Sequence, residues 1–363
     1  MPHPPGQPPS GRDVGYNTGM NIIQNVPLAN YSTMRLGGTG AYLVEVHDRS
    51  EVQEAAAWAS ERQLPIVVVG TGSNIVWRDE GFNGLIIVNK IMGFEEQQED
   101  DENYYVTVGA GENWDSVVAR TAAKGMTGIE ALALIPGTAG ATPVQNVGAY
   151  GQEVANTIVS LEAYDCQTKQ VITLQNSDCG FGYRTSRFKG IDHGRFIITH
   201  LTFHLLHQNP QPPFYPALQQ YFDEHGITDR TPAIVRAAVS AIRAAKLPDP
   251  AMVANTGSFF ANPIISLEKL DQLQDANNAG VPNWPTGDGQ AKIPAAWLVE
   301  HAGFKDAHDS ETGMGTWPTQ ALVLVNEHAA TTAQLLAFKQ KIVDAVQQKF
   351  GITLVQEPEL LPA

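Results

Sequence analysis

The sequence predicts an α+β protein built from two or three domains. Its 363 residues are enough for several hydrophobic cores. Helical and strand-like hydrophobic patterns follow one another along the chain, as expected for a mixed architecture. The segment 208–216, QNPQPPFYP, holds four prolines in nine residues, which keeps its backbone extended and indicates a domain boundary.

The N-terminal part is predicted to be an α/β unit that follows a disordered tail. Residues 1–20 are rich in proline and glycine and lack the apolar core of a signal peptide. A helix is expected to begin at overlapping capping boxes, Asp48 with Glu51 and Ser50 with Gln53. The expected elements are strands at 21–26, 41–46, 65–69 and 84–89 and a helix that ends at residue 62.

The next part is predicted to consist mainly of antiparallel strands. The acidic segment 95–103 indicates a solvated, hairpin-like excursion. His200, His204 and His207 do not predict a metal site, because in a strand the first two face one side and the third faces the other. The expected elements are strands at 104–109, 158–164, 170–174 and 195–205 and a helix at 114–124.

The C-terminal part is predicted to be a mixed unit that ends in a long helix. Thr331 and Gln334 form a capping box for this helix, and Gly351 ends it. The tail that follows, 352–363, is too apolar to be free, so we expect it to fold back on an earlier domain. The other expected elements are helices at 232–246 and 294–301, a turn and strand at 255–263 and a strand at 320–326.

Composition argues against several classes of function. The formal net charge of −15 disfavours a nucleic-acid partner, since phosphate neutralisation needs clustered Lys and Arg. No run approaches eighteen apolar residues, so no membrane insertion is predicted. Two cysteines, Cys166 and Cys179, are few for this length and fit a reducing compartment, so we expect a cytoplasmic protein.

Two glycine-rich stretches are the candidate ligand-binding segments. Residues 131–151 contain no charged side chain, and glycines in such a stretch let a large flat ligand lie against the main chain. The alternative is a tight buried loop without a ligand. The second stretch, 64–77, leads a buried strand into GTGSN (70–74), whose amides suit a pyrophosphate. It is not a Rossmann fingerprint, because Ile75 stands where the third glycine belongs, and no P-loop motif occurs.

Six short motifs, spread over nearly the whole chain, follow one another in the order in which a known family carries them. They are GTGSN (70–74), IPGTAGATPVQNVGAYG (135–151), FGYRTSRFK (181–189), KLPDP (246–250), GSFFANP (257–263) and EPEL (357–360). Together they resemble the UDP-N-acetylenolpyruvoylglucosamine reductase family. The segment QPPFYPAL (211–218) is similar to the loop with which the longer, type I form of that family covers its substrate.

The resemblance implies an NADPH-dependent flavoenzyme with non-covalently bound FAD. Such an enzyme reduces the enolpyruvyl group of UDP-N-acetylglucosamine-enolpyruvate to give UDP-N-acetylmuramate for peptidoglycan synthesis. The implied fold is a two-lobed FAD-binding domain of the vanillyl-alcohol-oxidase/PCMH type plus a C-terminal α+β substrate-binding domain. The expected boundaries are 21–92 and 93–206 for the lobes, 207–350 for the substrate-binding domain and 351–363 for a tail that returns to the active site.

The resemblance also implies three catalytic residues. Ser258 would donate the proton, while Arg184 and Glu359 would polarise and hold the substrate carboxylate. Hydride addition β to a carboxylate places negative charge on that carboxylate, which an arginine stabilises more in the transition state than in the ground state. Without the resemblance, the sequence favours simpler interpretations: Ser258 as a helix or turn cap, Arg184 as part of a surface ion pair and Glu359 as a solvated tail residue.

The remaining candidate residues line the expected cofactor and substrate sites. The cofactor set is Gly70, Thr71, Gly72, Ser73, Asn74, Gly137, Gly140, Gln145, Asn146, Gly148, Ala149, Tyr150 and Gly151. The substrate set is Tyr183, Tyr215, Lys246 and Asn262. Two departures from the family pattern, Ala261 where many members carry Lys and the run 313–319, leave their effect on substrate or nicotinamide contacts open.

The sequence alone leaves two other functions to consider, an oxidase and a binding protein without turnover. An oxidase of the vanillyl-alcohol-oxidase type commonly tethers FAD through a histidine, which neither glycine-rich stretch contains. A binding protein that had lost turnover would be expected to lack Ser258, Arg184 or Glu359. We expect a monomer.

Overall fold

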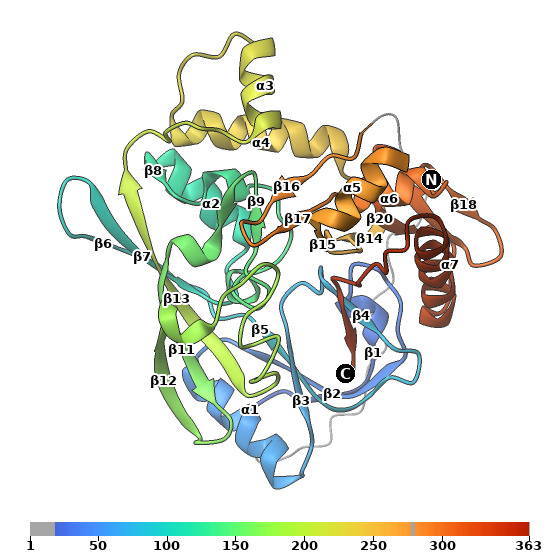
Figure 1. Ribbon diagram of the computed structural model, residues 1–363. Helices are drawn as coiled ribbons and strands as arrows, with labels where there is room; N and C mark the ends of the chain where they lie inside the picture. The colour runs from blue at the N-terminus through green and yellow to red at the C-terminus, as the bar shows by residue number, and fades with distance from the viewer. Residues whose placement is uncertain (1–18, 277–279, 363) are drawn as a thin grey trace, which may run out of the picture.

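The computed structural model describes residues 19–276 and 280–362 and has three parts (Figure 1). The predicted α+β class is confirmed. The predicted disordered tail, 1–20, lies almost entirely outside the described residues.

The first part is a four-stranded sheet in the order β1-β2-β5-β3, with α1 packed against it. Strand β5 is parallel to both of its neighbours, whereas β1 is antiparallel to β2. The Asp48 carboxylate caps α1 by accepting the Glu51 amide proton. The second predicted capping box is wrong, because the Ser50 hydroxyl donates to the Asp48 carboxylate instead. The elements are β1 (Ile23–Pro27), η1 (Leu28–Tyr31), β2 (Thr39–Val46), α1 (Arg49–Glu61), β3 (Ile66–Val69), β4 (Ile75–Trp77) and β5 (Phe82–Asn89).

The second part is an antiparallel sheet in the order β12-β11-β13-β7-β6, with β8 added to β13. Its hairpin β6–β7 is the predicted acidic excursion, and most side chains of β6 are exposed. The helices and strands are β6 (Phe94–Gln98), β7 (Asn103–Gly109), α2 (Trp114–Ala123), β8 (Met126–Thr127), β9 (Gly148–Ala149), β10 (Gln152–Glu153), β11 (Ile158–Asp165), β12 (Gln170–Gln175) and β13 (Phe196–His207). The 3-10 turns of this part are η2 (Glu130–Leu132), η3 (Ala139–Ala141), η4 (Val154–Asn156) and η5 (Asn176–Cys179).

Helices α3 (Pro216–Glu224) and α4 (Pro232–Lys246) belong to the core of the second part. Leu218 and Phe222 of α3 and Val235 of α4 pack in one buried cluster with Trp114 and residues of β13. Arg236 of α4 also forms an ion pair with Asp115 of α2 at 2.8 Å. The predicted boundary at residue 207 therefore does not coincide with a change of core.

The third part combines a four-stranded sheet, β14-β20-β19-β18, with a smaller sheet, β15-β17-β16. The predicted capping box of Thr331 with Gln334 begins α7, and Gly351 ends it at φ +65°. The elements are β14 (Ala254–Ser258), β15 (Ile264–Ser266), α5 (Leu267–Ala276), β16 (Trp284–Pro285), β17 (Gln290–Lys292), α6 (Ala295–His301), β18 (His308–Asp309), β19 (Met314–Trp317), β20 (Gln320–Asn326) and α7 (Thr332–Phe350).

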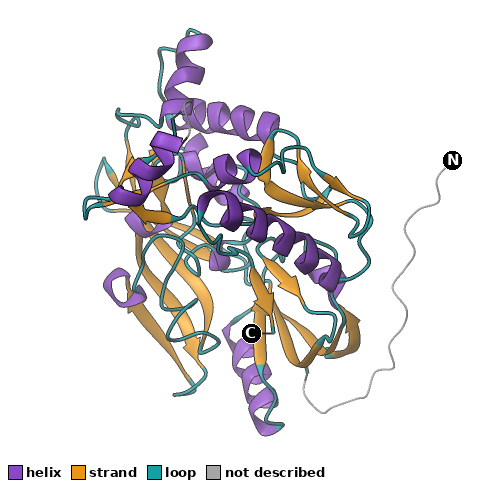
Figure 2. Ribbon diagram, turned by 45° about the vertical axis from the view of Figure 1, so that its right-hand side comes forward, coloured by secondary structure: helices purple, strands orange, loops and turns teal. Residues whose placement is uncertain are grey.

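The C-terminal tail returns to the first part, as predicted. Strand β21 (Glu359–Leu361) pairs in parallel with β4, and the two lie side by side in Figure 1. Before that, the tail runs beside the segment after β14, where the Ala261 amide donates to the Val355 carbonyl at 3.0 Å. Figure 2 shows the chain end among the strands rather than at the periphery. The tail thus connects the third part to the first.

No described helix combines the length and the apolar character needed to cross a membrane.

Candidate active site

Three adjoining cavities lie where the parts meet. We call them inner, middle and outer. The inner cavity is lined by β3, the turn 70–74, residues 135–145 and Glu359. The middle cavity lies between the turn 70–74, the wall 145–149 and the Ser258 segment. The outer cavity, of about 400 Å³, is bounded by residues 148–153, Tyr183 and Tyr215.

The turn 70–74 presents unpaired backbone amides to the inner cavity. Among the described residues, no group accepts a hydrogen bond from the N–H of Thr71, Gly72, Ser73 or Asn74. Gly72 has φ +71°, and a Cβ there would lie 2.2 Å from the Tyr31 carbonyl oxygen, so only glycine fits. Successive free amides in such a turn form an anion-binding nest.

The glycine-rich stretch 131–151 faces this turn across the cavity. The Asn74 side chain donates to Gln145 at 2.5 Å, and the Ser73 hydroxyl donates to the Pro136 carbonyl at 3.0 Å. These bonds hold the two predicted cofactor segments together. The wall they make consists of backbone and short side chains.

Asn146 has a supporting position rather than a place in the wall. It is 1% exposed and does not line any of the three cavities. Its amide donates to Glu153 at 2.8 Å and to the Gly182 carbonyl at 3.1 Å. Its side chain therefore ties the glycine-rich stretch to the Arg184 turn, and its predicted contact with the cofactor stays a prediction.

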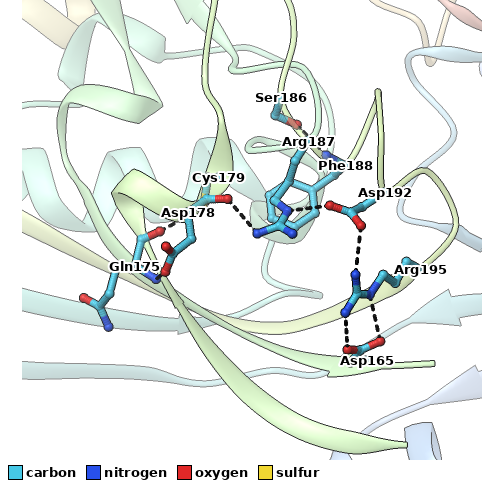
Figure 3. Close-up of polar contacts among 9 residues, drawn as sticks. All are labelled: Asp165, Gln175, Asp178, Cys179, Ser186, Arg187, Phe188, Asp192 and Arg195. Atoms are coloured by element: carbon cyan, nitrogen blue, oxygen red, sulfur yellow. Dashed lines mark hydrogen bonds and ion pairs between the residues drawn. The ribbon is translucent and has the colours of Figure 1, made fainter. Parts of the chain in front are cut away.

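The loop between β12 and β13, to which Arg184 belongs, is held by a frame of ion pairs among Asp165, Arg187, Asp192 and Arg195 (Figure 3). Asp165 binds Arg195 at 2.8 Å, and Asp192 bridges Arg195 at 3.1 Å and Arg187 at 2.7 Å. The neighbouring guanidinium groups hold the pKa values of Asp165 and Asp192 below their usual range. The frame fixes an otherwise irregular loop, and the Ser186 hydroxyl attaches it to the Val144 carbonyl at 2.6 Å.

Arg184 lies at the junction of the middle and outer cavities. Its backbone has φ +53°, an uncommon conformation for a residue with a side chain, in a tight turn closed by mutual hydrogen bonds of Gly182 and Thr185. Its Nη2 donates to the Gly148 carbonyl at 2.7 Å. The strained turn therefore directs the guanidinium across the glycine-rich wall.

Ser258 reaches the middle cavity because β14 is irregular there. The register of β14 with β20 shifts between Asn255 and Ser258, and Gly257 has φ +71°. The Asn255 side chain accepts the Gly257 amide proton at 2.8 Å and fixes the turn. A bulge of this kind re-aims the following side chain. The nearby Thr256 hydroxyl is buried without a partner among the described residues.

The tail places its two glutamates in different cavities. Glu359 lines the inner cavity, and its carboxylate contacts His193 Nε2. Glu357 lines the middle cavity with Arg184 and Ser258. Burial raises the pKa of Glu357, against the opposing charges of Arg184 and Lys189. The sequence prediction selected Glu359 from the motif EPEL, yet Glu357 is the glutamate that shares a cavity with the other two predicted catalytic residues.

Arg243 is a second middle-cavity residue that sequence reasoning missed. It lies on α4, one helical turn before Lys246, and lines the cavity with Ser258 and Glu357. Burial lowers its pKa, while Tyr150 and Asp115 oppose that shift. Its place within a helix, three residues before a motif used for the prediction, was the available signal.

The outer cavity collects most of the predicted substrate residues. Tyr183, Tyr215 and Asn262 line it, and the rings of Tyr215 and Tyr150 form a T-shaped pair with 5.5 Å between centroids. Burial raises the pKa of the Tyr183 hydroxyl. Tyr150 and Gly151, predicted as cofactor residues, line this cavity and not the inner one.

The lysine of the outer cavity is Lys292, not the predicted Lys246. Lys292 Nζ lies 4.6 Å from the Tyr183 ring centroid and 5.7 Å from that of Trp284, within reach of cation–π attraction. Lys246 is exposed at the end of α4 and does not line any of the three cavities. The sequence offered no signal for Lys292, because it comes from β17, the central strand of the small sheet β15-β17-β16, whose place beside the cavity depends on the packing of separate elements.

The other predicted residues line the inner, middle and outer cavities, which adjoin one another. Lining the inner cavity are Gly70, Thr71, Gly72, Ser73, Asn74, Gly137, Gly140 and Gln145. Lining both the middle and outer cavities are Gly148, Ala149 and Arg184.

The three histidines of β13 have separate partners. His200 contacts Glu162 at 3.2 Å, His204 contacts Asn103 at 2.8 Å, and the ring of His207 lies 5.8 Å from that of Tyr104 between centroids. The described residues contain no cluster of His, Cys, Asp and Glu that could hold a metal ion.

Comparison with known proteins adds to this geometry. Residues 40–174 match the FAD binding domain family, and residues 249–361 match the C-terminal domain of UDP-N-acetylenolpyruvoylglucosamine reductase. The chain is 40% identical over 337 residues to the UDP-N-acetylenolpyruvoylglucosamine reductase of Cupriavidus pinatubonensis, covering 92% of this chain and 98% of that protein. It is 37% identical over 338 residues to the reductase of the same description from Ralstonia nicotianae, with the same coverage of 92% and 98%.

A solved structure shares the fold. The crystal structure of UDP-N-acetylenolpyruvylglucosamine reductase (MurB) from Thermus caldophilus superposes with a TM-score of 0.64 at 20% identity. The match covers 94% of this chain and 99% of that one.

Proposed function

We propose a division of tasks among the three cavities of this chain, which belongs to the UDP-N-acetylenolpyruvoylglucosamine reductase family. The protein is an FAD-dependent reductase of peptidoglycan precursor synthesis that uses NADPH to reduce UDP-N-acetylglucosamine-enolpyruvate to UDP-N-acetylmuramate. FAD, when bound, takes a hydride from NADPH and gives it to the enolpyruvyl group. The residue roles below are our proposal.

The inner cavity has the chemistry needed to hold FAD. The free amides of residues 71–74 suit the pyrophosphate, because a nest of N–H groups binds phosphate oxygens without a lysine. The apolar faces of β3, with Val67 and Val68 lining the cavity, suit the flat ring systems. Two further lining residues, Thr138 and Gln145, provide polar groups that can orient the cofactor.

Arg184 would bind the substrate carboxylate. Hydride addition to the enolpyruvyl double bond moves negative charge onto that carboxylate. A guanidinium that already lies at the cavity wall, held by the Gly148 carbonyl, stabilises this charge without reorganising during the reaction. Arg243 adds a second positive charge to the same cavity.

Ser258 would protonate the carbon that becomes carbanion-like after hydride addition. A hydroxyl is a weak acid, so it can act only on a strongly basic centre held close to it. The bulge at Gly257 supports this role because it turns the Ser258 side chain into the cavity that Arg184 also lines. Glu359, which the family resemblance assigns to the carboxylate, would act from the inner-cavity side.

The outer cavity would receive the UDP-sugar portion. Tyr183, Tyr215 and Asn262 give it aromatic faces and an amide, and Lys292 gives it a cation for the diphosphate. The segment 208–216 brings Tyr215 to its edge, which supports the type I form with a covering loop. The two cysteines are free, which supports a cytoplasmic setting, and we propose a monomer.

One observation carries this proposal: Ser258, Arg184 and the glycine-rich wall open on a single cavity that adjoins the amide nest. The test is an anaerobic visible spectrum of the purified protein. We expect NADPH to bleach the flavin bands and the enolpyruvyl sugar to restore them. Recovery only with O₂ would indicate an oxidase instead, and bleaching with no recovery by either would indicate a binding protein without turnover.

A further inference from the structure

We propose that Glu357 is a positioning residue. It orients the Arg184 guanidinium toward the substrate carboxylate and fixes the position of that guanidinium relative to Ser258. The inference deepens the proposed function and rests on it. Glu357 comes from the tail, Arg184 from the second part and Ser258 from the third, and all three line the middle cavity.

The contact between Glu357 and Arg184 fixes one edge of the guanidinium. Arg184 Nε lies 3.4 Å from Glu357 Oε1, and the two side chains are only 24% and 13% exposed. The Nη2 atom is held by the Gly148 carbonyl at 2.7 Å. Two edges of a planar group are thereby fixed, while its remaining N–H groups stay available for a ligand carboxylate.

The tail backbone fixes Glu357 against the Ser258 segment. The Glu357 amide donates to the Phe259 carbonyl at 3.0 Å, and an antiparallel bridge joins Gln356 to Phe260. The Glu357 carbonyl accepts from Lys189 Nζ at 3.1 Å. A displacement of the tail would therefore shift Arg184 relative to Ser258, since Glu357 contacts the groups on both sides.

The Glu357 carboxylate also balances the charge of two neighbouring cations. Arg184 and Lys189 approach it from the second part, and burial of two cations without a carboxylate would be costly. Only the substrate half-reaction needs Arg184 in a fixed place, because the enolpyruvyl group carries a carboxylate, whereas the nicotinamide of NADPH carries a neutral carboxamide. Loss of Glu357 should therefore affect one half-reaction selectively.

The test measures the two half-reactions separately by anaerobic stopped-flow with the FAD-loaded protein. For Glu357→Gln we expect reoxidation of the reduced flavin by UDP-N-acetylglucosamine-enolpyruvate to slow about 10- to 100-fold, the effect of a small misplacement of a reacting group. Flavin reduction by NADPH should stay within about threefold of wild type. Glu311→Gln, at an exposed surface ion pair with Lys341, is the matched control and should change neither rate.

A double-mutant comparison separates positioning from a general structural role. In an Arg184→Ala background, Glu357→Gln should cause no further slowing of reoxidation, because its partner is gone. Additive losses, equal slowing of both half-reactions, no slowing at all, or loss of FAD from Glu357→Gln would each overturn the proposal. If wild-type flavin is not reoxidised by the enolpyruvyl sugar, the proposed function fails instead, which distinguishes the two failures.

Discussion

The inner cavity and the middle cavity adjoin each other but are built from different materials. The inner wall is made mainly of backbone amides, glycines and apolar β3 side chains, joined by the side chains of Lys189, His193 and Glu359. The middle wall combines glycines and apolar residues with a group of charged and hydroxyl side chains, Arg184, Arg243, Ser258 and Glu357, drawn from four separate segments. We infer that retention of the cofactor depends on local backbone shape, whereas reduction of the substrate depends on how the parts are assembled.

The largest effect is expected from Ser258→Ala in the middle cavity. Loss of a positioned proton donor should slow reoxidation of the flavin by the enolpyruvyl sugar about 10²- to 10⁴-fold. FAD content and reduction by NADPH should remain normal, because Ser258 lines the middle cavity only. Anaerobic stopped-flow absorbance measures both rates. A comparable loss of FAD would show that the two walls are not separable.

The next effect is expected from Gly72→Ala in the inner cavity. The new Cβ would meet the Tyr31 carbonyl oxygen at 2.2 Å in a backbone with φ +71°. The turn must shift, so we expect FAD affinity to fall about 100-fold, equivalent to about 3 kcal/mol. Titration of the apoprotein with FAD measures it.

Gly226→Ala is the matched control for this change. Gly226 has φ +61° after α3, but no atom lies within 4 Å of the added Cβ. It carries the same kind of backbone strain without the collision and lies outside the three cavities. Equal loss of FAD affinity in both variants would contradict a specific role of the turn.

A smaller effect is expected in the outer cavity, from Lys292→Ala. Loss of one cation facing the diphosphate should raise the KM for the UDP-sugar about tenfold with little change in kcat. Lys246→Ala, on the exposed end of α4, should change KM by less than about twofold. Steady-state kinetics with varied UDP-sugar compare the two. The reverse order would restore the sequence-based assignment of Lys246.

The smallest effect is expected from the frame of the Arg184 loop, as a dependence of stability on pH. The pKa values of Asp165 and Asp192 are lower in the folded protein than their ordinary value of 3.8. Their contribution to stability is therefore complete above that value and is lost as the pH falls through the lower folded-state values. Asp165→Asn should lower Tm by several degrees near neutral pH, and the difference from wild type should shrink in acid. Thermal melts at a series of pH values check this, and a difference that grows in acid would contradict it.

The sequence predicted best where local chemistry decides the structure. The bounds of α4 (Pro232–Lys246) and β20 (Gln320–Asn326), the capping box that begins α7 and the return of the tail all agree with the structure. Periodicity, caps and turn residues are encoded by neighbouring residues, so they can be read without the fold. The turn 70–74, with its exposed amides, is likewise a feature that neighbouring residues encode.

The sequence predicted less where distant segments meet. The choice between Glu357 and Glu359 depends on how an irregular tail presents each side chain, and the places of Lys246 and Lys292 depend on the packing of separate elements. The proline-rich segment 208–216 looked like a domain boundary, yet α3 and α4 share the core of the second part, because apolar side chains on both sides of the segment bury together. Spacing along the chain does not contain this information.

The most direct test of a separable cofactor wall and chemical wall is anaerobic stopped-flow on Arg184→Ala. The account predicts a full complement of FAD, reduction by NADPH within about threefold of wild type, and reoxidation by UDP-N-acetylglucosamine-enolpyruvate slowed at least about 100-fold. Loss of FAD, or equal slowing of reduction and reoxidation, would contradict it.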